Sequence, residues 1–125
     1  MPTKEVSVDE ILSAELLYQR SIPEMVLDWT KDLVNALEKD YDRRYPNSSD
    51  PVRFSITSGR KYWKINQNHG GVHAFVDKNT GEVYKPASYN APAKHVRYDL
   101  RVINDRAKLH DPRYTGWSGG YLYMR

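Results

Sequence analysis

Residues 52–85 read VRFSITSGRKYWKINQNHGGVHAFVDKNTGEVYK, and apolar side chains recur in this stretch at every second position. Four runs share the period, at residues 52–57, 61–66, 72–77 and 82–85, and turn-forming sequences such as DKNTG separate them. A period of two is typical of strands that bury one face. The stretch therefore predicts an antiparallel β-meander of up to four strands.

The same alternation sorts the strand side chains into two faces. Trp63 and Ile65 share an apolar face, so Tyr62 and Lys64 lie on the opposite one. Trp63 is therefore expected in the core, whereas Tyr62 and Lys64 are expected at the surface together with Tyr84 and Lys85.

The chain before residue 50 has a helical period instead. Ser7 with Glu10 forms a capping-box pattern ahead of a helix expected over residues 8–20. Ser21 with Glu24 repeats the pattern and opens a second helix, which should end before Pro46.

The change of period near Pro51 indicates an α+β fold. We expect two N-terminal helices packed on one face of the antiparallel meander, followed by a long C-terminal loop-rich segment. The expected core contains large apolar residues from both parts, namely Trp29, Leu33, Phe54, Trp63 and Val76.

The chain after the meander gives weaker signals. Residues 86–92 predict an ordered loop, and residues 94–104 suit either a strand or a short helix. The run Tyr121–Met124 suggests a last strand.

A chain of 125 residues is near the commonest size of one domain, so residues 1–125 are expected to share one core. The absence of cysteine excludes disulfides, a thiolate nucleophile and zinc sites built on thiolates, and it fits a reducing cytosol. No apolar h-region or membrane-length segment is present, so we expect neither ordinary export nor a membrane partner.

Charge is divided unequally along the chain. Residues 1–50 carry eleven acids and six bases, a net charge of −5, whereas residues 51–125 carry thirteen bases and five acids, a net charge of +8. The acidic helical part spans 1–46 and the basic sheet part 52–125. The basic part either attracts an anionic partner or is neutralised by the acidic part within the fold. The pair Asp40 and Asp42 is interpreted as charge decoration on a solvated helical face.

Bases and aromatic rings alternate in the sheet part. Cations neutralise phosphates and flat rings stack on unpaired bases, which is how sheet platforms bind single strands. The members are Lys61, Lys64, Lys85, Lys94, Arg97 and Arg101, with Tyr62, Trp63, Tyr84, Tyr89 and Tyr98. No established nucleic-acid motif accompanies them.

His73 lies in the middle of a predicted strand. Convergence of His73 with Lys85 and Tyr98 would be sufficient for metal-free phosphodiester chemistry, whereas a histidine beside aromatic residues is also common as a packed, hydrogen-bonded group. No nucleophile motif and no close histidine pairing is present, so we expect no catalytic residue, no metal and no cofactor.

Several short runs after residue 60 are shared with a known group of proteins. These runs are KYWKI (61–65), VHAFVDK (72–78), GEVYKPAS (81–88), APAK (91–94) with Arg97, and GGYLY (119–123). Over residues 61–123 the chain resembles small uncharacterised proteins of tailed bacteriophages, particularly those of actinobacterial hosts. The resemblance implies a phage protein made in the bacterial cytoplasm, and it singles out His73, Lys85, Ser88, Lys94 and Arg97 as recurring positions.

We expect a non-enzymatic module that binds a macromolecule through its basic-aromatic sheet surface, with nucleic acid as the first candidate. The candidate binding residues are Tyr62, Lys64, His73, Tyr84, Lys85, Ser88, Lys94 and Arg97. One alternative is an inhibitor of a host protein or a minor virion component that uses the acidic helices, and another is a small metal-free nuclease.

Overall fold

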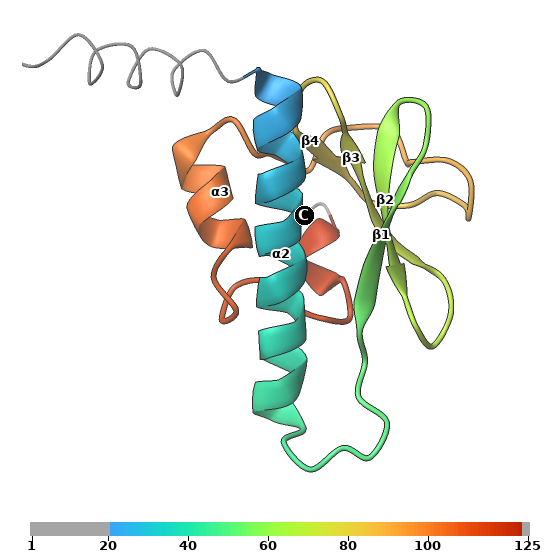
Figure 1. The fold of residues 1–125 in the computed structure, drawn as a ribbon, viewed down its shortest axis with the longest axis vertical. Helices are drawn as coiled ribbons and strands as arrows, with labels where there is room; N and C mark the ends of the chain where they lie inside the picture. Colours follow the sequence, from blue (N-terminus) through green and yellow to red (C-terminus); the bar gives the residue numbers. More distant parts are fainter. Residues whose placement is uncertain (1–20, 124–125) are drawn as a thin grey trace, which may run out of the picture.

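Helices cover one face of a five-stranded antiparallel sheet in the computed structural model, which describes residues 21–123 (Figure 1). The elements are α2 (Ile22–Arg44), β1 (Phe54–Ser58), β2 (Tyr62–Gln67), β3 (Val72–Asp77), β4 (Glu82–Tyr84), β5 (Tyr98–Asp99), α3 (Ile103–Leu109) and the 3₁₀ helix η1 (Gly120–Leu122). The predicted α+β class is confirmed. The helix expected over residues 8–20 lies outside the described residues.

Helix α2 follows the helical pattern of the sequence. Ser21 is its N-cap, Pro23 lies in its first turn, and the helix ends at Arg44. The side chain of Ser21 makes no capping hydrogen bond, so the serine half of the predicted capping box is absent. The Ser21 carbonyl instead accepts hydrogen bonds from the N–H groups of Glu24 and Met25, at 3.1 and 3.2 Å.

The strands are ordered β1-β2-β3-β4-β5, as they occur in the chain. Ile56 of β1 pairs with Ile65 of β2, and Ile65 pairs with Ala74 of β3. The buried apolar residues of the sheet form one core with the buried face of α2; this core contains Val26, Leu33, Leu37, Phe54, Ile65, Val76 and Val83. Trp29 and Trp63, expected inside the core, are only partly buried and pack against it.

Asp40 of α2 is buried, which corrects its interpretation as charge decoration. Its side chain is 0% exposed and accepts hydrogen bonds from the Trp117 N–H at 3.0 Å, from Arg43 Nη2 at 2.8 Å and from Arg44 Nε at 2.9 Å. Asp42 is exposed, as expected, and pairs with Arg53. The C-terminal segment that carries Trp117 covers Asp40, and the sequence pattern of α2 alone cannot reveal such a contact.

The C-terminal third contains short elements. Residues 94–104 hold both structures that the sequence left open, because β5 occupies 98–99 and α3 begins at Ile103. The strand predicted for Tyr121–Met124 is wrong, since residues 120–122 form η1. Gly119 has φ +89° and turns the chain away from an extended path before that helix begins.

Within residues 21–123, neither α2 nor α3 combines the length and the apolar character that a membrane-spanning helix needs.

Candidate functional site

The sheet side chains that point away from α2 form a surface that we call the outer face. Its central row is Lys64, Phe75 and Tyr84, which are register partners on β2, β3 and β4, and Tyr62 belongs to the same face of β2. No helix of residues 21–123 lies on this side, and the loop that follows β4 passes over part of it (Figure 1).

Aromatic rings of the outer face touch one another edge to face. The Tyr62 ring lies 5.8 Å from the Phe75 ring and 5.9 Å from the Tyr84 ring, at interplanar angles of 76° and 81°. Phe75 is 2% exposed, so the tyrosines and the loop cover it almost completely. Tyr89, from the loop, is 63% exposed. Tyr62 and Tyr89 thus offer rings at a surface that a rigid sheet supports.

Cations border these rings on the side of β1 and β2. Lys64 Nζ lies 4.1 Å from the centroid of the Tyr89 ring, and Lys61 Nζ lies 5.4 Å from that of Tyr62, both within cation–π range. A groove of about 370 Å³ runs beside them and is lined in part by Arg60, Lys61, Tyr62 and Lys64. None of the described residues that line this groove is acidic.

The outer face is acidic where β3 ends and β4 begins, because Asp77 and Glu82 lie there. Burial raises the pKa of Tyr84, and the nearby carboxylates of Glu82 and Asp77 raise it further. The Asp77 carboxylate is hydrogen-bonded within its own turn, because its Oδ1 accepts hydrogen bonds from the N–H groups of Asn79 and Thr80 at 2.8 and 3.1 Å. Asp77 is also the register partner of Tyr62, so an anionic ligand is favoured on the side of the outer face where Lys61 and Lys64 lie.

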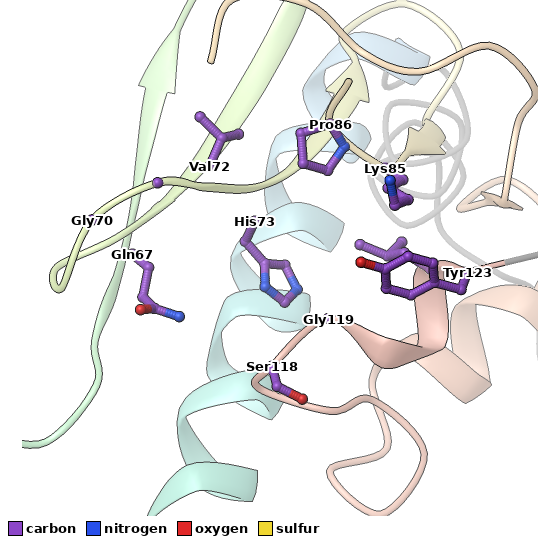
Figure 2. A pocket seen from close by; sticks show the side chains of 11 residues that line it. Gln67, Gly70, Val72, His73, Lys85, Pro86, Ser118, Gly119 and Tyr123 are labelled. Atoms are coloured by element: carbon purple, nitrogen blue, oxygen red, sulfur yellow. The ribbon is translucent and has the colours of Figure 1, made fainter. Parts of the chain in front are cut away.

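Lys85 does not share the outer face with Tyr84, which corrects the expectation that both lie beside Tyr62. Successive residues of a strand point to opposite sides, so Lys85 projects toward the C-terminal segment. Its Nζ lies 4.9 Å from the centroid of the Tyr123 ring. Lys85 and His73 line one cavity there (Figure 2).

His73 is a packed residue at an irregularity of the sheet. The register between β2 and β3 shifts at Ile65 and Asn66, and the His73 ring lies against Phe54, with ring centroids 5.1 Å apart. His73 Nε2 is 2.8 Å from the hydroxyl of Tyr121. Burial lowers the pKa of His73 to about 4, so its ring is neutral near pH 7.

The other candidate residues belong to the loop after β4. Ser88 is exposed, and its N–H donates to the Ala91 carbonyl at 3.1 Å within the ordered loop that the sequence predicted. Lys94 is exposed. The Arg97 guanidinium donates to the Leu122 carbonyl at 2.7 Å and to the Lys94 carbonyl at 3.1 Å, so it ties this loop to the C-terminal segment.

The histidine, lysine and tyrosine of the nuclease hypothesis do not share one cavity. Tyr98 lines a neighbouring cleft, where its hydroxyl donates to the Tyr121 carbonyl at 2.8 Å and lies 2.8 Å from the Tyr114 hydroxyl. His73 meets Tyr121 instead. Among residues 21–123, histidine and acidic side chains form no group of three or more that could hold a metal ion.

Sequence reasoning missed the role of the C-terminal segment, which supplies Ser118, Tyr121 and Tyr123 to these cavities. The signal was the pair Gly119-Gly120, which disfavours a strand and allows close approach of the backbone. Arg60 of the groove was also missed, because it lies in a turn beside Gly59.

The model of a family described as "Family of unknown function (DUF7717)" matches residues 14–124. Neither a curated protein nor a solved structure matches the chain.

Proposed function

We propose that this chain, which belongs to the family of unknown function DUF7717, is a non-enzymatic protein that binds single-stranded nucleic acid on its outer face. The observation that carries the proposal is the groove without acidic lining, in which Arg60, Lys61 and Lys64 lie beside the Tyr62 ring. Cations in such a groove can neutralise consecutive phosphates while the ring stacks on an unpaired base.

The position of Lys64 supports this role. Its ammonium group lies 5.9 Å from the Phe75 ring centroid and 4.1 Å from that of Tyr89, so two rings fix its place above the sheet. A charge held in this way loses less side-chain entropy when it meets a phosphate. Tyr89 would flank the same strand from the loop side.

The resemblance of residues 61–123 to small phage proteins supports a second part of the proposal. The protein would be a phage accessory factor that acts in the cytoplasm of a bacterial host. The alternative is an inhibitor of a host protein or a minor virion component, which would contact its partner through the acidic surface of α2, where Asp28, Asp32 and Asp42 are exposed.

Salt-dependent binding tests the proposal. Fluorescence anisotropy would follow the titration of labelled single-stranded DNA and RNA between about 50 and 200 mM salt. Three cations in the groove predict a slope of log affinity against log salt of roughly −2, because each neutralised phosphate of a single strand contributes about −0.7. The same sequence as a duplex should bind more weakly, because its bases are paired.

Two substitutions separate charge from stacking. Lys64→Met should weaken binding to every sequence and reduce the slope by about 0.7. Tyr62→Leu should weaken binding by about 1–3 kcal/mol and leave the slope unchanged. Lys31→Met is the matched control, since Lys31 is exposed on α2 and the helix lies on the opposite side of the sheet (Figure 1). Absence of binding at the lowest salt concentration would refute the proposal and favour the protein-binding alternative.

A further inference from the structure

A second polar site lies at the side of the sheet, in the cavity that is lined by His73 and Lys85 (Figure 2). The cavity has a volume of about 220 Å³ and lies between the β2–β3 turn, the residues after β4 and the C-terminal segment. Its polar lining includes Gln67, His73, Lys85 and Ser118. Sites for drug-sized ligands begin at about 300 Å³ and one water occupies about 30 Å³, so this cavity fits one small polar group.

One nitrogen of His73 is available to such a group. Nε2 is bonded to Tyr121, whereas Nδ1 has no hydrogen-bond partner among the described residues. Within residues 21–123, Trp63 Nε1 is the one fully enclosed side-chain nitrogen or oxygen without a partner. His73 Nδ1 is therefore not fully enclosed and can be reached from the cavity.

Gly119 keeps that nitrogen accessible. A Cβ atom at Gly119 would lie 3.6 Å from His73 Cε1 and 3.8 Å from Nδ1, so any larger side chain would begin directly against this edge of the ring. The φ angle of +89° also favours glycine at this position. The backbone therefore leaves open the edge of the ring on which Nδ1 lies.

The charge of the cavity favours an anion. Lys85 is the one charged side chain among its described lining residues if His73 is neutral, and no carboxylate lines the cavity. Three uncharged groups can donate beside it, namely the Ser118 hydroxyl, the Gln67 amide and His73 in the tautomer with a proton on Nδ1. A phosphate monoester presents three acceptor oxygens, whereas a carboxylate presents two.

A shallow pocket links the cavity to the outer face. This pocket, of about 240 Å³, shares Val72 and Pro86 with the cavity and extends to Ser88 and Tyr89. Tyr89 contacts Lys64 of the outer face. A strand lying on Tyr62 and Lys64 thus has a path along the loop to Lys85.

We propose that the cavity formed by His73, Lys85, Ser118 and Gly119 binds the phosphate of a phosphomonoester, either the terminal phosphate of a strand or that of a free mononucleotide. The first source rests on the proposed function of the outer face. The second source does not, because the cavity also adjoins the tyrosine cleft of Tyr98 and Tyr114 through the shared residues Ser118 and Tyr123.

The test compares five probes on the whole chain: one thymidine oligonucleotide with a 5′-phosphate, a 3′-phosphate or two hydroxyl ends, and thymidine 5′-monophosphate beside thymidine. Affinity and the NMR signals of the His73 ring are the two readouts. Either the 5′-phosphorylated or the 3′-phosphorylated oligonucleotide should bind about tenfold more tightly than the hydroxyl-ended one, because its terminal phosphate gains a charge-assisted hydrogen bond. It should also shift the His73 signals.

Variants assign the effect to the cavity. Lys85→Met should abolish the preference for the phosphate, and Ser118→Ala should reduce it. Lys31→Met should leave the preference unchanged. These lysines and Ser118 are exposed or partly exposed, so the variants should retain the fold.

The outcomes distinguish this inference from the proposed function. Equal binding of all three oligonucleotides without a shift at His73 overturns the inference and leaves the outer face as a binding surface. If no oligonucleotide binds but thymidine 5′-monophosphate shifts His73 in a Lys85-dependent way, the cavity is a mononucleotide site and the proposed function fails. If no phosphorylated probe shifts His73, the inference is wrong whatever the outer face binds.

Discussion

Acidification should destabilise the protein through His73, well above the pH at which carboxylates become protonated. Burial lowers the pKa of this histidine from 6.5 to about 4, whereas in the unfolded chain the ring regains the ordinary value. Between these two pH values the unfolded chain binds a proton that the folded protein does not bind. The free energy of unfolding therefore falls as the pH falls below 6.5 and stops falling, as far as His73 is concerned, near pH 4.

The size of this loss follows from the shift. One pKa unit corresponds to about 1.4 kcal/mol, so the full shift of His73 amounts to about 3 kcal/mol. Such a loss is large beside the total stability of about 5–15 kcal/mol that is usual for a domain. The pKa values of Asp40 and Asp99 are lowered, so these carboxylates affect stability in a different pH range. Their contributions to the free energy of unfolding are lost only as the pH falls below the ordinary value of 3.8.

Urea unfolding followed by tryptophan fluorescence, repeated at several pH values, measures the effect. His73→Gln should flatten the pH dependence between 6.5 and 4 relative to the native sequence. His95→Asn is the control, because His95 is exposed and asparagine tolerates its φ of +65°. Equal slopes for the native protein and His73→Gln would refute the reasoning. So would an NMR titration in which the His73 ring of the native protein becomes protonated near pH 6.5.

Two further substitutions test the packing around α2. Asp40→Asn should lower the free energy of unfolding in urea by about 2–4 kcal/mol, because it weakens the buried acceptor of the Trp117 N–H and of two arginines. The control Asp42→Asn changes an exposed carboxylate and should cost under about 1 kcal/mol. Equal losses in the two variants would mean that Asp40 is not buried. Gly81→Ala should cost about 1–3 kcal/mol, since φ is +78° and the new Cβ would lie 3.3 Å from two core side chains. Gly70→Ala, with φ +108° and open space, should show the backbone cost alone, and a similar loss in both glycine variants would exclude a packing contribution at Gly81.

The sheet and α2 were predictable because burial imposes a period on them. Strands β1 to β4 lie where the period of two predicted, and Leu33 and Leu37 of α2 are buried as the helical period requires. Each of these elements is long enough for several residues to repeat the signal. The class of the fold follows from these residues alone.

The short elements after residue 94 carry no such repetition. Two residues form β5 and seven form α3, so contacts from distant parts of the chain decide their structure. At Tyr121 the alternation of Tyr121, Leu122 and Tyr123 resembles a strand, but the conformation of Gly119 redirects the backbone. The strand propensity of residues 121–123 gives no information about the turn at Gly119.

The candidate site was predictable only where strands are regular. Alternation assigned Tyr62 and Lys64 to the outer face, and the register agrees. The same alternation places Lys85 and Tyr84 on opposite faces, because they are successive residues of a strand. The expectation that both belong to one surface was inconsistent with this alternation. The meeting of His73 with Tyr121, 48 residues away in the chain, depends on the shifted register and on the C-terminal turn, which no local pattern encodes.

The positive charges of the sheet part differ in their partners. Among the described residues, Arg53 forms an ion pair with Asp42 of α2. Arg101 pairs with its neighbour Asp99, and Lys61 and Lys64 lie over aromatic rings. These lysines thus remain available to an anionic partner, but an acidic protein would neutralise them as well as a nucleic acid would. Stacking on Tyr62 distinguishes the two, because a nucleobase presents a flat face to that ring and a carboxylate does not.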